Sequence, residues 1–189
     1  MFPCSLNDVM LAFLRAELDS PTERGKLLQC LRQLNIDEAL LRSEARVDAV
    51  TVFDAYRGFE AIFEGFPWES LAWGATALNH EDVVGSVDTC RHNFERRYGT
   101  RRLQEVVFQL EAAEQDQLRG ILTKVLLGQR LEPPILVRES ATSNLVIVEG
   151  HNRMMAYLLF WQELDWPVDV LVGTGLHVSS WVEWPASSS

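Results

Sequence analysis

The feature that most constrains the fold is a buried strand that passes directly into a buried helix. Leu145-Val146-Ile147-Val148 is a continuous apolar run, typical of a strand covered on both faces. Glu149-Gly150 ends it, and an apolar segment with helical spacing follows from about Asn152 to Glu163. Asp165-Trp166-Pro167 stops this helix, and residues 168–172 form another apolar strand. Strand, helix and strand in this order predict a crossover unit on a small mixed sheet.

A second strand and two helices are predicted immediately upstream. Pro133-Pro134 ends a helical segment, and Ile135-Leu136-Val137 begins a strand that a polar turn connects to the run described above. This pattern predicts a β-hairpin. The apolar spacing over 103–110 and 118–126 predicts two helices, and Gly128 is placed to end the second in a left-handed conformation.

The first part of the chain is predicted to form a helical extension. Ser5 with Asp8 is a capping box before an apolar stripe, and Ser20-Pro21-Thr22-Glu23 combines a cap, a first-turn proline and a capping acid. The expected fold class is therefore α+β. A helical extension over 1–64 precedes a domain over 65–189, in which helices pack on a small mixed sheet.

Composition places the chain among globular proteins with an excess of negative charge. It has 189 residues, 47% of them hydrophobic, and a formal net charge of −10. The longest unbroken apolar run, 154–161, is too short to span a bilayer, and the three cysteines form no CxxC pair. We therefore expect a cytoplasmic protein without a transmembrane segment, in which any contact with nucleic acid needs a local basic patch.

Five arginines within twelve residues provide such a patch: Arg91, Arg96, Arg97, Arg101 and Arg102. Arginine can donate two hydrogen bonds to one phosphate, and the chain holds 15 arginines but only 2 lysines. The functional interpretation is a surface that follows a DNA backbone, with the tyrosine of this segment available for stacking. The alternative is a solvated helix end joined to a loop, and the sequence leaves both open.

The residues between the buried strand and the buried helix, Glu149-Gly150-His151-Asn152-Arg153, are the strongest candidates for chemistry. A helix N-terminus exposes unpaired N–H groups and a partial positive charge, so it favours anions. Gly150 permits close approach of a ligand, and Arg153 adds a charged donor. Glu149 suits a metal ligand or a base that orients water, and His151 suits a proton shuttle or a phosphate contact. A tight turn that binds nothing is the alternative interpretation.

Three stretches together resemble the core of the ParB/sulfiredoxin superfamily. They are Pro133 to Val137, Leu145 to Val148, and Glu149 to Arg153 followed by Ala156-Tyr157. The superfamily pattern is a strand after a proline pair, a hairpin, a Gly-x-x-Arg turn, and a helix with a small residue facing the sheet. The resemblance is close over 131–173 and loose over 66–130.

This resemblance implies that the Gly-x-x-Arg turn holds the phosphates of a nucleoside triphosphate such as ATP. Gly150 would let the phosphates approach, Arg153 would clamp them, and His151 and Asn152 would complete the site. A divalent metal such as Mg²⁺ would bind Glu149. His151 stands where sulfiredoxins have a catalytic cysteine, and no partition-type DNA-binding region is recognisable, so sulfinic acid repair and DNA segregation are disfavoured.

The length, the acidic arginine-rich composition and the six tryptophans further resemble fertility-inhibition factors, by which one plasmid blocks DNA transfer from the same cell. The superfamily resemblance implies a nucleoside triphosphate hydrolase and deoxyribonuclease, with Glu149, His151 and Arg153 as catalytic residues. Such an enzyme would suppress conjugative or oncogenic (T-DNA) transfer by attacking the transferring DNA.

Two other interpretations remain open from the sequence. The first is a non-catalytic inhibitor that docks on the coupling protein of a type IV secretion system at the inner membrane, through its acidic N-terminal helices or its tryptophans. The second is a nucleotide-gated DNA clamp, although the chain lacks the flanking regions expected of one.

Overall fold

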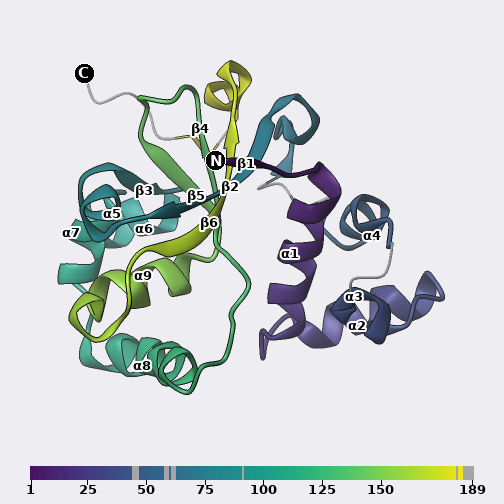
Figure 1. Cartoon of the computed structure of the whole chain (residues 1–189), viewed down its shortest axis with the longest axis horizontal. Coiled ribbons are helices and arrows are strands. Elements are labelled where there is room, and N and C mark those ends of the chain that lie inside the picture. Colours follow the sequence, from purple (N-terminus) through teal and green to yellow (C-terminus); the bar gives the residue numbers. More distant parts are fainter. Residues whose placement is uncertain (44–46, 58–59, 61–62, 91, 182, 185–189) are drawn as a thin grey trace.

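The structure is a computed structural model that describes residues 1–43, 47–57, 60, 63–90, 92–181 and 183–184. Over these residues a mixed sheet of six strands stands between two layers of helices (Figure 1). The expected α+β class with a mixed sheet is therefore confirmed. In spatial order the strands are β1 (Phe2–Pro3), β2 (Ala72–Leu78), β6 (Val168–Thr174), β4 (Ile135–Arg138), β5 (Leu145–Glu149) and β3 (Val87–Thr89).

The predicted hairpin and the predicted strand that follows it are both present. β4 and β5 pair antiparallel, with Val137 opposite Val146, and β6 pairs parallel to β4, with Leu136 opposite Val172. The strand–helix–strand unit differs from a simple parallel crossover in one respect. β6 runs antiparallel to β5 and is separated from it, because the hairpin partner β4 occupies the position between them.

Side chains of the central strands alternate between two apolar clusters, one on each face of the sheet. The face towards the N-terminal helices carries Ile135, Val137, Val146, Val148 and Leu171. The opposite face carries Leu136, Leu145, Ile147, Val170 and Val172. Strands that are covered on both faces have no polar side to alternate with, which explains the unbroken apolar runs of the sequence.

The first helical layer consists of α1 (Leu6–Leu18), α2 (Arg24–Gln33), α3 (Glu38–Arg42) and α4 (Ala49–Tyr56). Ser5 and Asp8 form the predicted capping box of α1. α2 begins later than predicted, at Arg24, because Glu23 does not close a box with Ser20. The Glu23 carboxylate instead contacts Lys26 and Arg57, and Ser20–Glu23 forms a turn.

The second helical layer lies on the other face of the sheet, at the left of Figure 1. It consists of α5 (His80–Ser86), α6 (His92–Tyr98), α7 (Leu103–Phe108), α8 (Ala112–Leu126) and α9 (His151–Leu159). Gly128 ends α8 as predicted, with a φ of 75° and hydrogen bonds from the Gly128 and Gln129 amides back to the last turn. α9 is shorter than predicted, since a 3₁₀ turn over Trp161–Glu163 replaces its last turn.

The N-terminal helices and the sheet share one apolar core. Met10 and Phe13 of α1 and Phe53 of α4 belong to the same cluster as Val146 and Leu171 of the sheet. β1, which precedes α1, pairs with Gly74 and Ala75 of β2 at the edge of the sheet. Within the described part of the chain, no helix is long and apolar enough to cross a membrane.

Candidate functional site

Gly150 forms a left-handed turn between β5 and α9. Its φ is 92° and its ψ is 24°, and it stands at the N-cap position of α9. A Cβ at this position would lie 2.9 Å from Pro134 Cβ and 3.1 Å from Arg153 Nη2. The turn therefore requires glycine twice, because of its backbone conformation and because of its close neighbours. The chain can thus pass directly from a buried strand into a helix whose first amides follow the turn.

Arg153 lies across this turn, where two acceptors hold it. Its Nη2 is 2.7 Å from Glu149 Oε1, and its Nη1 donates to the backbone oxygen of Glu132. The second carboxylate oxygen of Glu149 accepts the backbone N–H of Gly150. The side chains of Arg153 and Glu149 are only 12% and 20% exposed. The structure therefore brings the two predicted charged residues together as an ion pair, in which both oxygens of Glu149 are engaged.

His151, the first residue of α9, is buried beneath the turn. Its exposed fraction is 4%, and its Nε2 lies 3.6 Å from the thiol sulfur of Cys90, which follows β3. The ring of Phe94 is stacked against the imidazole, with ring centroids 5.7 Å apart. Asn152, by contrast, is exposed. The five predicted residues therefore surround one turn, but His151 contacts the protein interior and Asn152 faces solvent.

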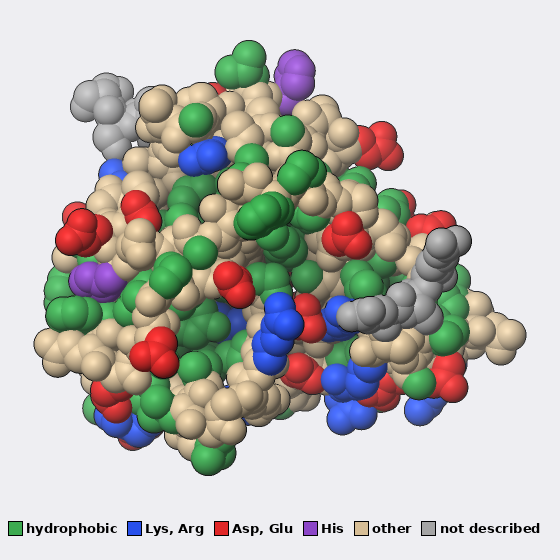
Figure 2. All heavy atoms as spheres, viewed as in Figure 1, with side chains coloured by type: hydrophobic (Ala, Val, Ile, Leu, Met, Phe, Trp, Pro, Cys, Tyr) green, Lys and Arg blue, Asp and Glu red, His purple; other side chains and the backbone are tan. Residues whose placement is uncertain are grey.

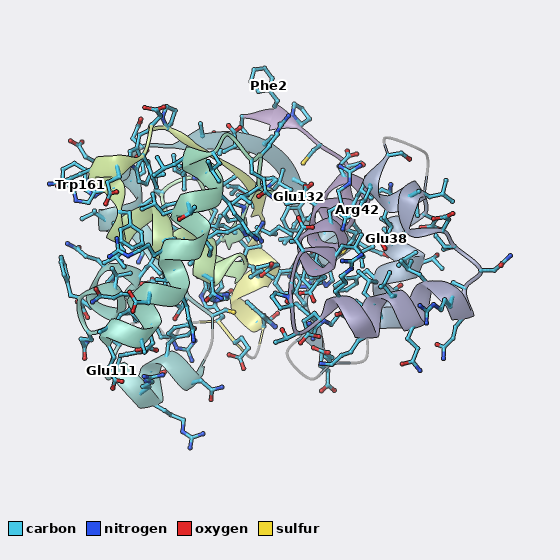
Figure 3. The ribbon with its side chains drawn as sticks, turned by 90° about the horizontal axis from the view of Figure 1, so that it is seen from below. Phe2, Glu38, Arg42, Glu111, Glu132 and Trp161 are labelled. Carbon is cyan, nitrogen blue, oxygen red and sulfur yellow. The ribbon has the colours of Figure 1, made fainter. Side chains whose placement is uncertain are left out.

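A hollow of about 620 Å³, which we call the groove, opens beside the turn. One wall comes from α1 and the segment after it, and the other comes from α8, the loop before β4 and the first turn of α9. Figure 3 shows Glu132, on that loop, between the N-terminal helices and the rest of the molecule. The ionisable side chains of the groove are Glu17, Asp19, Glu23, Glu132, Glu149, Arg57, Lys124 and Arg153, besides His151.

Carboxylates outnumber cationic groups in the groove. Burial raises the pKa of the Glu132 carboxyl above its usual value, although Arg15 and Arg153 favour its ionised form. On the face seen in Figure 2, acidic and basic side chains are interleaved rather than gathered by sign. A bare polyanion would therefore meet repulsion as well as attraction at this site.

A buried charge network forms the N-terminal wall of the groove. Arg57 Nη2 lies 3.0 Å from Glu17 Oε2 and 3.0 Å from Glu23 Oε2, and Tyr56 donates to Glu17 at 2.9 Å. Burial raises the pKa of Glu17, and the charge of Glu149 across the groove adds to this effect, while Arg57 opposes it. The carboxylates of Glu17 and Glu149 therefore repel each other across the groove.

The predicted DNA-contact arginines are mostly paired with acidic residues. Arg97 Nη1 is 2.9 Å from Glu114 Oε1, Arg101 Nε is 2.9 Å from Glu95 Oε2, and Arg102 Nε is 3.2 Å from Asp88 Oδ1. Arg101 and Arg102 also extend the edge of the sheet, because the amide of Thr89 donates to the Arg101 oxygen at 2.8 Å.

The other two arginines of that segment are Arg96 and Arg91. Arg96 is exposed and forms no ion pair with any described residue. Arg91 lies outside the described residues. Of the described arginines of the segment, Arg96 thus offers the most accessible charge to a phosphate backbone.

Sequence reasoning missed the N-terminal wall of the groove and the thiol beside His151. Glu17, Glu23 and Arg57 come from the segment expected to be only an extension, and no sequence spacing places Cys90 beside His151. A signal for Glu17 is present in the sequence. It follows Phe13 by four residues and Leu14 by three, so it continues the apolar stripe of α1, where a carboxylate needs a partner.

The geometry of the turn and the groove is what characterises the site. Among the described residues, no three His, Cys, Asp or Glu side chains form a group that could hold a metal ion. Comparison of the chain with models of protein families, with curated proteins and with solved structures finds no match. The arrangement itself defines a class of site: a glycine turn at a helix N-terminus, with an anchored arginine, beside a groove.

Proposed function

We propose that the groove binds and hydrolyses phosphate esters, so that the protein is a nucleoside triphosphate hydrolase that also cleaves DNA. The observation that carries the proposal is the left-handed Gly150 at the start of α9, with the guanidinium of Arg153 anchored over the same turn. Backbone amides that follow such a glycine point outwards from the helix end, where a phosphate can accept from them. The volume of about 620 Å³ is in the range of ordinary ligand sites.

Each residue of the turn has a role in this proposal. The amides of the first turn of α9 bind the phosphate oxygens, and Arg153 donates its remaining N–H groups to them. Glu149 orients the attacking water through a carboxylate lone pair that its two contacts leave free, and it accepts the proton of the water while the bond from phosphorus to the leaving oxygen breaks. His151 supports the turn from below through its contacts with Cys90 and Phe94.

A divalent metal does not fit Glu149 in the arrangement seen. The guanidinium of Arg153 lies 2.7 Å from Glu149 Oε1, and its positive charge would repel a cation on the same carboxylate, so coordination would require the ion pair to open. The proposed hydrolysis therefore uses no metal bound to Glu149. A cation carried by the nucleotide, such as Mg²⁺, would still reduce the repulsion between its phosphates and the groove carboxylates.

Cleavage of DNA requires a surface that binds the phosphate backbone. Arg96 supplies the accessible charge for a phosphate backbone, whereas the paired arginines would have to exchange their carboxylate partners. The resemblance to the ParB/sulfiredoxin superfamily and to fertility-inhibition factors supports a biological role. In that role the protein would suppress conjugative or T-DNA transfer by attacking the transferring DNA.

The test compares Arg153→Ala with Arg32→Ala, which removes an exposed arginine that does not line the groove. Circular dichroism first establishes that both variants are folded. We expect phosphate release from ATP and nicking of supercoiled plasmid DNA, both in the presence of Mg²⁺. Both activities should fall at least tenfold in Arg153→Ala and persist in Arg32→Ala.

Three results would contradict the proposal or a part of it. Inactive wild-type protein, or equal activity in wild type and Arg153→Ala, would remove the groove as a hydrolytic site. If Arg153→Ala lost hydrolysis but still suppressed conjugative transfer in cells, the biological effect would instead come from a non-catalytic inhibitor, for example one that docks on the coupling protein.

A further inference from the structure

A second hollow, of about 250 Å³, adjoins the groove on the side of α6. Asn152, Gln117 and Ile121 line both hollows, so the two meet at the first turn of α9 and the middle of α8. The phosphate-binding turn lies on one side of Asn152, and the smaller hollow lies on the other. One extended ligand that passes Asn152 could therefore occupy both.

Aromatic and aliphatic side chains form the walls of the smaller hollow. Phe94 and Tyr98 stand one turn apart on α6, with ring centroids 6.0 Å apart and planes inclined by 25°. Leu118 and Met155 are buried beside them. The Tyr98 hydroxyl donates to Glu114 at 2.8 Å, which fixes the orientation of its ring. These walls suit a flat, mostly apolar group.

The polar groups that remain available in this hollow are side-chain amides. Asn93, Gln117 and Asn152 line it, and their side chains form no hydrogen bond with any described residue. Each amide offers a donor and an acceptor side by side. The charged groups of the hollow, by contrast, satisfy one another, because Glu114 accepts from Tyr98, from Arg97 and from the Glu111 amide. The hollow therefore favours a neutral ligand over a charged one.

We propose that the hollow between α6, α8 and α9 binds the base of the nucleotide whose phosphates contact the turn at Gly150. The phosphate half of this inference rests on the proposed function, whereas the base half rests on the hollow alone. A nucleobase is flat, neutral and edged by adjacent donors and acceptors, and an amide pairs with such an edge, as with N6 and N7 of adenine. The segment around α6, expected to contact a DNA backbone, would then bind the base of a bound nucleotide.

The test measures by calorimetry how adenosine, ATP and inorganic tripolyphosphate bind to the full chain. The blocking variant is Asn93→Trp, which fills the hollow from an exposed position on α6. The control is Gln33→Trp, at an exposed position that lines neither hollow. Base stacking should make ATP bind about 5- to 150-fold more tightly than tripolyphosphate. This advantage should disappear in Asn93→Trp and persist in Gln33→Trp.

Two outcomes would overturn the inference, and each is distinguishable from a failure of the proposed function. Equal affinity for ATP and tripolyphosphate, unchanged in Asn93→Trp, would remove the base site and leave the phosphate site in place. If neither triphosphate binds, the proposed function fails. The binding of adenosine then shows whether the hollow is a base site. Saturable adenosine binding that Asn93→Trp abolishes supports the base site, and its absence in the wild type refutes it.

Discussion

The turn at Gly150 can be tested by adding a single methyl group. In Gly150→Ala the new Cβ would lie 2.9 Å from Pro134 Cβ, 3.0 Å from Pro134 Cα and 3.1 Å from Arg153 Nη2. A φ of 92° also places alanine in a region that L-residues seldom adopt. The substitution should therefore destabilise the protein in two independent ways.

The control separates these two contributions. Gly128 has a φ of 75°, but a Cβ there would meet nothing within 4 Å, so Gly128→Ala carries backbone strain alone. That strain costs about 1–2 kcal/mol. Crowding in a packed region adds about 1–3 kcal/mol, so Gly150→Ala should cost about 2–5 kcal/mol in total. For a chain of this size, these free energies correspond to losses in Tm of roughly 2–8 °C for Gly128→Ala and roughly 4–20 °C for Gly150→Ala.

The assay is urea denaturation of both variants, followed by circular dichroism, with the wild type measured in parallel. Gly150→Ala should also weaken triphosphate binding, since its methyl group displaces Arg153 Nη2. Equal destabilisation of the two variants would refute the reasoning. It would mean that Pro134 yields without cost and that the close approach at Gly150 does not hold Arg153 in place.

Other measurements test the remaining contacts. Arg101→Ala removes bonds to Glu95 and to a backbone oxygen from a side chain that is 9% exposed, so it should cost about 1.5–3 kcal/mol. Arg96→Ala, at an exposed position, should change the free energy of unfolding by less than about 0.5 kcal/mol. Equal losses of stability in the two variants would contradict the pairing of Arg101 with Glu95. Burial raises the folded-state pKa of Glu17, so its ionisation lowers stability as pH rises above about 4.5 through the raised value. Denaturation across pH should show a flatter decline for Glu17→Gln than for the wild type, and a steeper decline would reverse the assigned direction. Of the three thiols, only that of Cys4 should react with a thiol reagent in the native protein, because the other two are buried.

The elements that the sequence predicts correctly are those with local signals. The capping box of Ser5 and Asp8, the hairpin and the left-handed Gly128 each depend on a few neighbouring residues, and each is present. The elements that it misses depend on distant partners. β2 contains Ala72, Gly74 and Ala75, which have low strand propensity, yet it pairs along its whole length with β6. β3 has three residues and exists through pairing with β5.

The same distinction applies to the site. The turn from Glu149 to Arg153 is recognisable because a buried strand, a glycine and a helix start are contiguous in the sequence. The opposite wall of the groove is more than ninety residues away, in α1 and after α4, so no spacing rule connects it to the turn. The position of Glu17 in an apolar stripe indicates a buried partner, but it does not say which part of the chain supplies the facing surface.

The ion pairs of the structure change what the charges of the chain imply for the catalytic and the docking interpretations. The acidic excess of the N-terminal helices suggested a surface for docking, but Glu17, Glu23 and Glu60 surround Arg57, and Glu38 pairs with Arg42. The carboxylates around Arg57 would have to leave an arginine that is only 15% exposed before they could bind a partner, which would leave a largely buried charge unpaired. Most of the described arginines after α6 are likewise paired with carboxylates. Charge counted along the sequence thus overstates the charge available to a macromolecule. Arg153 is likewise paired with Glu149, but the residues of the Gly150 turn line a hollow, so the groove is the place where the catalytic and docking interpretations can be separated.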